Sequence, residues 1–170
     1  METITPYLSQ EQILKKVKEL ADTLAKERTI EAVVVLDGAL PFYKALEKEL
    51  HARRVHVTPH FIKVKSYQGT ESTETMRLAQ DVDGVQGKHL WIIEDIIDTG
   101  YTINFVVGHL QQKGAASVKI CTLFHKKVKT KVPIAPDLVG FEVSDAFLVG
   151  FGLDYDGRHR KLPYVGVLKQ

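Results

Sequence analysis

The chain has 170 residues, of which 44% are hydrophobic, and a formal net charge of +2. This is enough apolar material for one packed core, so we expect a single domain over residues 1–170. A charge so close to neutral does not provide the broad basic surface of a nucleic-acid binder, and no apolar run approaches the roughly 20 residues that span a bilayer. Cys121 is the only cysteine, which excludes an internal disulfide and fits a reducing cytoplasm. We therefore expect a cytoplasmic protein with a small-molecule partner, no nucleic-acid partner and no membrane association.

The first predicted elements are a helix, a strand and a second helix. Ser9 and Gln12 can cap a helix reciprocally, and apolar residues then recur over 13–24 at spacings of four and three. A continuous apolar run at 32–36 predicts a buried strand that ends at an Asp-Gly pair. Pro41 is favoured in the first turn of the helix that follows.

An extended stretch at 55–64 leads into a segment, 66–80, in which polar residues and glycine dominate and no apolar period is found. Loops of this length are usually functional or disordered. We therefore expect 66–80 to be a mobile active-site loop that closes over the reaction.

The second half of the chain continues the alternation of strand and helix. Apolar runs predict strands at 90–93 and 118–124, with a helix at 102–110 between them. Alternating strands and helices predict an α/β fold, in which a parallel sheet is covered on both faces. From 137 onward, apolar residues alternate with turn residues, which predicts short strands folded over one end of the sheet.

The most informative segment is the turn after the strand at 90–93. Glu94, Asp95 and Asp98 precede a Thr-Gly-x-Thr sequence, 99–102, that opens the next helix. A helix N-terminus carries unpaired N–H groups and a positive partial charge, and its glycine and threonines suit a phosphate monoester. The adjacent carboxylates at a strand end can accept from ribose hydroxyls or hold a hydrated divalent cation. The alternative is an ordinary solvated turn, in which Asp98 or a threonine only caps the helix.

Several segments together carry a resemblance to a known family. The stretch 92–102 resembles the phosphoribosyl pyrophosphate motif of type I phosphoribosyltransferases, and the chain from Val33 to its end resembles the hypoxanthine-guanine phosphoribosyltransferase family. The further matching segments, in the family's order, are Leu36-Asp37-Gly38, Lys65-Ser66-Tyr67, Leu123-Phe124-His125-Lys126, and 136–142 running on through 147–150 to 153–155.

The resemblance implies both the fold and the activity. The fold is a central parallel sheet flanked by helices, with a small hood over the carboxyl ends of the strands. The activity is purine salvage, in which hypoxanthine or guanine reacts with phosphoribosyl pyrophosphate to give IMP or GMP and pyrophosphate. Purine base, phosphoribosyl pyrophosphate and nucleoside monophosphate are the implied partners, Mg²⁺ is the implied cofactor, and a homodimer or homotetramer is expected.

By the same resemblance, Asp98 is the general base, and Glu94, Asp95 and Asp154 are the metal ligands. A carboxylate suits this position, because it can remove a proton from the purine and stabilise the positive charge that develops on the sugar. Lys126 is expected to donate to the exocyclic oxygen of the purine. The full set of implied substrate-binding residues is Gly38, Ser66, Tyr67, Glu94, Asp95, Ile96, Ile97, Asp98, Thr99, Gly100, Tyr101, Thr102, Lys126, Phe147, Leu148, Asp154 and Arg160.

Each of the residues implied for the purine and the pyrophosphate also has a plain structural interpretation. Lys126 belongs to a basic run, 125–131, that is typical of a solvated surface, and we expect the other lysines of the run, Lys127, Lys129 and Lys131, to point to solvent. Phe147, implied to stack on the purine, can instead belong to the core. Leu148 is implied to offer its backbone to the base. Arg160, implied to meet pyrophosphate, can instead be an exposed charge.

Two positions depart from the family pattern. Asp37 occupies the pyrophosphate loop where many members have a basic residue, so only the backbone around Gly38 carries over. Ala146 stands where some members have lysine. The histidines are scattered and show no spacing typical of metal ligands.

Two other functions compete with this interpretation. A regulator with the same fold can sense phosphoribosyl pyrophosphate or nucleotide without catalysis, but the short basic run offers little affinity for nucleic acid. A transferase for another base is the second alternative. Lys126 is a donor only, which suits a 6-oxo group and is unfavourable toward the amino group of adenine. Hypoxanthine, guanine and xanthine all stay open.

Overall fold

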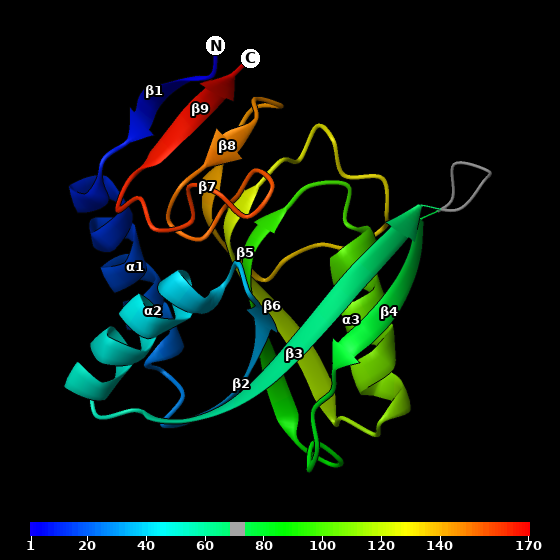
Figure 1. Ribbon diagram of the computed structural model, residues 1–170. Coiled ribbons are helices and arrows are strands. Elements are labelled where there is room, and N and C mark those ends of the chain that lie inside the picture. The colour runs from blue at the N-terminus through cyan, green and yellow to red at the C-terminus, as the bar shows by residue number, and fades with distance from the viewer. Residues whose placement is uncertain (69–73) are drawn as a thin grey trace.

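A six-stranded sheet forms the centre of the computed structural model, which describes residues 1–68 and 74–170 (Figure 1). The strand order is β4-β3-β2-β5-β6-β7. The strands are β2 (Thr29–Leu36), β3 (His56–Gln68), β4 (Glu74–Gln80), β5 (His89–Ile97), β6 (Ser117–His125) and β7 (Leu138–Glu142). Only β4 runs antiparallel to its neighbour, and the other paired strands are parallel. The predicted α/β class is therefore confirmed.

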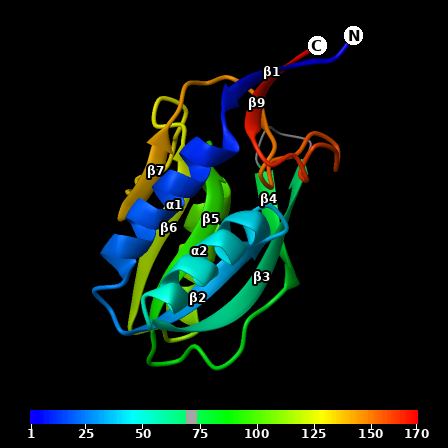
Figure 2. The same ribbon diagram turned by 90° about the vertical axis from the view of Figure 1, so that its left-hand side faces the viewer.

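Helices cover both faces of this sheet. α1 (Gln10–Leu24) and α2 (Leu40–Ala52) lie side by side on one face, as Figure 2 shows, and α3 (Tyr101–Gln112) packs on the other. Successive side chains of a strand point to opposite faces. In β2, Val34 therefore joins the core under α1 and α2, whereas Val33 and Val35 join the core under α3. Burial on both faces explains why the central strands read as unbroken apolar runs.

The helix starts follow the local signals in the sequence. Ser9 Oγ accepts a hydrogen bond from the Gln12 amide at 3.1 Å, and Gln12 Oε1 accepts one from the Ser9 amide at 2.8 Å. The predicted capping box of α1 is therefore confirmed. Pro41 lies in the first turn of α2, also as predicted.

A second, smaller sheet lies above the carboxyl ends of the central strands (Figure 1). It consists of β1 (Thr3–Leu8), β9 (Val165–Lys169) and β8 (Leu148–Val149) in the order β1-β9-β8, with antiparallel pairing. We call these three strands and the connecting residues 150–164 the hood. β8 and β9 confirm the short strands expected beyond 137. β7 differs, because it joins the edge of the central sheet, and β1 has no counterpart among the predicted elements.

The segment 66–80 differs most from its prediction. β3 continues to Gln68 and pairs with β4, with Ser66 opposite Met76 and Tyr67 opposite Thr75. The interpretation of an irregular loop is therefore wrong for 66–68 and 74–80. Residues 69–73 of the predicted mobile loop lie outside the described residues, and closure over the reaction stays a prediction.

Pairing with a neighbouring strand explains why polar composition was misleading here. Met76 and Leu78 are half-buried, and the residues between and beside them are exposed, so β4 has the alternation of a strand with one covered face. The guanidinium of Arg77 also lies over the ring of Tyr67 at 5.2 Å.

In the described parts, 1–68 and 74–170, no helix has the length and apolar composition needed to cross a membrane.

Candidate active site

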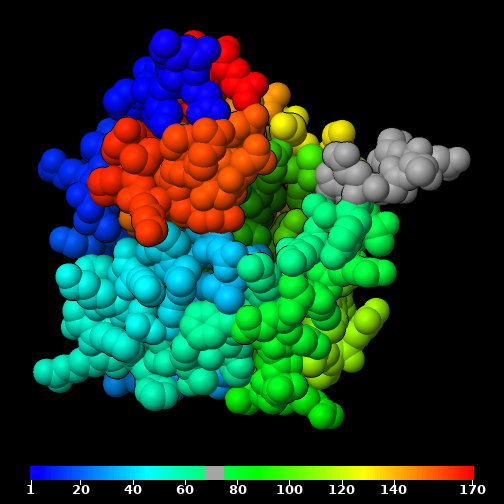
Figure 3. Space-filling model, viewed as in Figure 1, coloured from blue at the N-terminus to red at the C-terminus, as the bar shows by residue number. Residues whose placement is uncertain are grey.

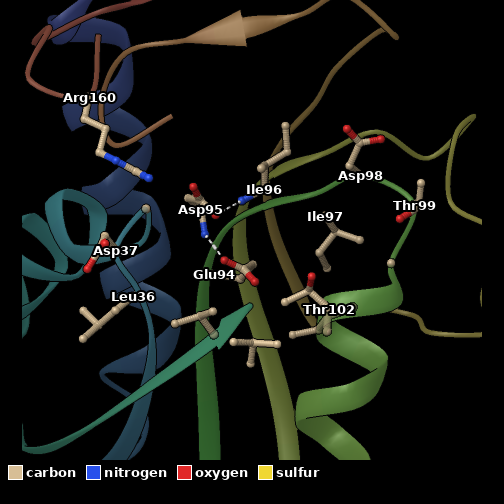
Figure 4. Close-up of a pocket in the computed structure, with 15 residues that line it drawn as sticks. Leu36, Asp37, Glu94, Asp95, Ile96, Ile97, Asp98, Thr99, Thr102 and Arg160 are labelled. Atoms are coloured by element: carbon tan, nitrogen blue, oxygen red, sulfur yellow. Dashed lines mark hydrogen bonds between the residues drawn. The ribbon is translucent and has the colours of Figure 1, made fainter. Parts of the chain in front are cut away.

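The residues of the predicted phosphate site surround one cavity at the carboxyl ends of β2 and β5. Its volume is about 290 Å³, and 35–38, 94–100 and Arg160 of the hood form most of its wall. Figure 3 shows a hollow between the hood and the central sheet, and Figure 4 shows the side chains around the cavity. Open α/β sheets bind their ligands at this edge.

The turn between β5 and α3 leaves the amino end of the helix open. Gly100 is the N-cap and has a φ of 91°, a backbone conformation that favours glycine. A Cβ there would lie 2.5 Å from Cγ2 of Val132. No side chain in the described part of the chain caps α3, so the interpretation of Asp98 or Thr99 as an ordinary helix cap is wrong. The first N–H groups of the helix are available for an anion, and Thr99 and Thr102 line the same cavity.

The loop at 36–38 packs directly against the carboxylates. A Cβ on Gly38 would overlap Oδ2 of Asp95, so this position has no room for a side chain. A Cβ on Gly152 of the hood would likewise overlap the carbonyl oxygen of Gly38, and Gly152 has a φ of 100°. The peptide bond between Leu36 and Asp37 is cis. Two glycines therefore bring the loop, the hood and the end of β5 together at the cavity.

Glu94 and Asp95 are two adjacent acids in a poorly hydrated position. Glu94 Oε1 accepts from the Asp95 amide at 3.0 Å, and Asp95 Oδ1 accepts from the Ile96 amide at 2.8 Å (Figure 4). Burial raises the pKa of Glu94 well above its ordinary value, and the carboxylate of Asp95 raises it further. Burial also raises the pKa of Asp95, although hydrogen bonds with Glu94 and from the Ile96 amide, and to a smaller extent the positive charge of Arg160, oppose this shift. Such a pair is stabilised by a cation or by hydroxyl donors, which fits the predicted magnesium and ribose partners.

Asp98 faces two lysines from the segment after β6. Lys126 Nζ lies 3.5 Å from Asp98 Oδ2, and Lys129 Nζ lies 3.5 Å from Asp98 Oδ1. Lys126 is only 3% exposed, so a solvated surface is the wrong interpretation for it. The expectation that Lys129 points to solvent is also wrong, because this lysine bridges Asp98 and Asp145. Each of these two lysines forms an ion pair with Asp98, which is distant from them in the sequence.

An aromatic ring lies just before β8, and the hood supplies an arginine. Phe147 is 48% exposed, so it does not belong to the core, and its ring meets that of Tyr155 edge-on at 5.6 Å. Arg160 Nη1 donates to the carbonyl of Gly152 at 2.8 Å, and Nη2 lies 3.2 Å from Asp154 Oδ1. Arg160 is therefore held at the cavity wall by the hood rather than freely solvated.

A family model described as "Phosphoribosyl transferase domain" matches residues 4–156 of the chain. The chain belongs to the phosphoribosyltransferase family. It is 44% identical over 167 residues to the hypoxanthine-guanine phosphoribosyltransferase of Bacillus subtilis (strain 168), which covers 95% of this chain and 91% of the relative. A hypoxanthine phosphoribosyltransferase structure from Staphylococcus aureus is similar with a TM-score of 0.89 and 36% identity, and the match covers 96% of this chain and 90% of the other. A hypoxanthine-guanine phosphoribosyltransferase structure from Bacillus anthracis has a TM-score of 0.89 and 32% identity, with 100% of both chains covered.

The phosphoribosyltransferase brings only part of the predicted site to the cavity wall. The predicted residues that line it are Gly38, Glu94, Asp95, Ile96, Ile97, Asp98, Thr99, Gly100, Thr102 and Arg160. The predicted residues that do not line it are Ser66, Tyr67, Tyr101, Lys126, Phe147, Leu148 and Asp154. Lys126 reaches the site through its contact with Asp98, and Asp154 through its ion pair with Arg160. Ser66 and Tyr67 are exposed on β3, and Leu148 is buried in β8.

Sequence reasoning missed the contacts that Asp37 makes. Asp37 lines the cavity, and its Oδ2 lies 2.9 Å from Nζ of Lys63 on β3. The positions are 26 residues apart, and nothing in their local patterns pairs them. The negative charge that departs from the family pattern is therefore balanced by a lysine of the neighbouring strand.

Proposed function

We propose that this phosphoribosyltransferase transfers the ribose 5-phosphate group from phosphoribosyl pyrophosphate to hypoxanthine or guanine, giving IMP or GMP and pyrophosphate. One observation carries this function. An uncapped helix N-terminus, suited to a phosphate, lies beside a carboxylate that a buried lysine contacts. The relatives named hypoxanthine-guanine phosphoribosyltransferase, at 39–44% identity, support the same substrates.

In the proposed site, the N–H groups and hydroxyls of 98–102 bind the 5-phosphate, and the backbone around Gly38 together with Arg160 binds pyrophosphate. The purine lies between Phe147 and the phosphate turn, with its 6-oxo group accepting from Lys126. A bond forms between a purine ring nitrogen and the sugar as the bond from the sugar to pyrophosphate breaks. Asp98 accepts the proton that the other ring nitrogen loses, which makes the attacking nitrogen a stronger nucleophile.

Magnesium is the proposed cofactor. Within 1–68 and 74–170, no cluster of three or more histidine, cysteine or acidic side chains could by itself hold a metal ion. This fits Mg²⁺, which keeps several waters and is usually bound through one or two carboxylates and the phosphates of a substrate. Glu94 and Asp95 would hold it at the ribose, and Asp154 is proposed at a second ion. When bound, the metal would neutralise the departing pyrophosphate.

A homodimer or homotetramer in the cytoplasm is part of the same proposal. Asp37 and Arg160 also line a second, largely apolar cavity of about 500 Å³, and Leu40, Pro41 and Leu162 contribute to its wall. An apolar surface beside a catalytic site suits contact between subunits. Cys121 is buried as a free thiol, which suits a reducing compartment.

The test is product formation with each common nucleobase, phosphoribosyl pyrophosphate and magnesium. We expect turnover with 6-oxopurines and little with adenine.

Lys126→Ala should lower kcat/KM for hypoxanthine by roughly 10- to 100-fold, because it removes a charged hydrogen-bond donor. Lys127→Ala is the matched control, since Lys127 is exposed, and it should change little. Absence of turnover with every 6-oxopurine, with nucleotide still bound, would favour the regulator instead.

A further inference from the structure

Lys129 lies between the carboxylate of Asp98 and the loop that leads into β8 of the hood. Its ammonium group lies 3.5 Å from Asp98 Oδ1 and 3.3 Å from Asp145 Oδ1. Asp98 is the proposed general base, and Asp145 precedes the proposed base-stacking residue, Phe147, by two positions. We propose that Lys129 is a positioning residue of the transfer reaction, which couples the orientation of Asp98 to the loop that carries Phe147. This inference rests on the proposed function of Asp98.

The backbone fixes the place of Lys129 relative to the phosphate turn. The amide of Lys126 donates to the carbonyl of Ile97 at 2.9 Å, and the amide of Lys131 donates to the carbonyl of Thr99 at 2.8 Å. Between them, the hydroxyl of Thr130 donates to the carbonyl of Asp98 at 3.0 Å. Lys129 is therefore carried by a segment that is hydrogen-bonded to three successive carbonyls of the turn, so its distance from Asp98 does not depend on a free loop.

The charge balance at Asp98 explains why a second lysine is useful. One carboxylate faces two ammonium groups, with Lys126 on Oδ2 and Lys129 on Oδ1. To donate to the purine oxygen, Lys126 has to weaken its attraction to Asp98. Lys129 then remains as the counter-ion, so the buried Oδ1, which makes no hydrogen bond with the described residues, is not left without a neighbouring positive charge. Without Lys129, Asp98 and Lys126 would pair more strongly and compete with the base.

The state of the Lys129 ammonium agrees with this geometry. The carboxylate of Asp98 raises the pKa of Lys129 above its ordinary value, and the hydrogen bond to Asp145 raises it further. The group therefore stays charged throughout the neutral range. The side chain is 41% exposed, so water screens part of the interaction, and a moderate effect is expected rather than complete loss of activity.

The test is a steady-state comparison of single variants of the full chain. Lys129→Met keeps the length of the stem and removes the charge. We expect it to lower kcat/KM for hypoxanthine by about fivefold through both a lower kcat and a higher KM, with KM for phosphoribosyl pyrophosphate unchanged within about twofold. Lys129→Arg keeps the charge and should stay within about twofold of wild type. Lys127→Met, an exposed neighbour in the same run, is the matched control and should behave as wild type.

Coupling to the loop that carries Phe147 is tested by adding Asp145→Asn. Alone, this variant should raise KM for hypoxanthine and leave kcat nearly unchanged. Combined with Lys129→Met, it should add little, because the same bridge is already broken. Equal kinetics for Lys129→Met and Lys127→Met, or failure of Lys129→Arg to restore activity, would overturn the inference.

The proposed role of Asp98 is tested separately by Asp98→Asn. A fall in kcat of roughly a hundredfold or more supports Asp98 as the base. If that fall occurs and Lys129→Met has no effect, Lys129 is not a positioning residue, although the proposed function stands. If Asp98→Asn leaves kcat unchanged, the assignment of Asp98 fails, and the inference about Lys129 fails with it.

Discussion

A glycine decides whether the loop at 36–38 can approach the carboxylates at the end of β5. A Cβ on Gly38 would overlap Asp95 Oδ2, so only glycine lets the backbone lie this close to the Asp95 side chain. Asp95 is held in turn by the Ile96 amide at 2.8 Å, so it cannot retreat without losing that bond. The contact joins two segments that are 57 positions apart in the chain, counted from 38 to 95.

Gly38→Ala should therefore damage substrate binding. We expect KM for phosphoribosyl pyrophosphate to rise at least about tenfold and the free energy of unfolding to fall by about 1–3 kcal/mol, the usual range for overpacking. Steady-state kinetics and urea unfolding would measure both changes. Gly108→Ala is the control, because no atom lies within 4 Å of a Cβ there and the residue lies inside α3. It should leave KM unchanged and raise stability by about 0.5–1 kcal/mol.

Single residues of the site were predictable where the chemistry was concentrated in a short stretch. Glu94, Asp95 and the turn that follows them occur together in the sequence, and the structure places them around one cavity. The pairing of Asp37 with Lys63 and the bridge made by Lys129 were not predictable in the same way. Each depends on a charge that the fold brings close from another element, and a local pattern carries no information about such a partner.

At the scale of elements, burial determined what the sequence could reveal. The strands that are covered on both faces have unbroken apolar runs, and the runs at 32–36, 90–93 and 118–124 lie within β2, β5 and β6. The strands that were missed or misplaced, β1, β4 and β7, are edge strands of the two sheets. An edge strand is stabilised mainly by hydrogen bonds to one neighbour, so it can be polar and short without losing its place.

The end of the edge strand β4 is connected to α3 by the carboxylate of one aspartate. Asp81 follows β4, and its carboxylate lies 2.7 Å from His109 Nε2 and 3.1 Å from Lys113 Nζ, both on α3. Burial raises the pKa of Asp81, but the hydrogen bonds with His109 and from the Val82 amide outweigh this effect, and the pKa lies below its ordinary value. The charged form is therefore more stable in the folded chain than in the unfolded chain.

Asp81→Asn tests this tie through the dependence of stability on pH. A lowered pKa gives stability that is present above the ordinary pKa of about 4 and is lost as the pH falls through the folded value. The carboxylate is 41% exposed, so we expect the variant to lose only about 0.5 kcal/mol at pH 7. The difference from wild type in urea unfolding should narrow below about pH 4. Asp83→Asn, at an exposed neighbouring position, should show no such pH-dependent difference.

At the scale of the whole molecule, the two ends of the chain meet in the hood, above the candidate active site. β1 pairs with β9 from Thr3 opposite Lys169 to Leu8 opposite Val165, and Figure 1 shows both termini together on the hood. The sequence predicted short strands near the C-terminus, but no local signal indicated that the first residues would complete their sheet. Pairing across almost the full length of a chain is decided by the fold, because only the folded sheet offers the free edge.

A line of contacts connects this joined edge to the proposed purine site. Glu2 accepts from both terminal nitrogens of Arg158, at 3.2 and 2.7 Å. The guanidinium of Arg158 lies 5.4 Å from the centre of the Tyr155 ring, and Tyr155 in turn meets the ring of Phe147 edge-on. A two-point contact of this kind fixes the plane of the guanidinium as well as its position. Glu2 therefore helps to hold the ring that braces the proposed base-stacking residue, although the two are at opposite ends of the sequence.

Glu2→Gln should weaken the contact of Glu2 with Arg158, and so the support of the Tyr155 and Phe147 rings, without changing the groups proposed to react. The amide can accept at only one oxygen and has no charge, so Arg158 loses its two-point contact. Because the pair is exposed, we expect KM for hypoxanthine to rise only about two- to fivefold, with kcat and KM for phosphoribosyl pyrophosphate unchanged. Glu11→Gln, at an exposed acid in the first turn of α1 that forms no ion pair with Arg158, removes the same charge and should leave all three constants unaltered. If both variants raise KM for hypoxanthine equally, the change reflects net charge, and the ends of the chain do not position the base.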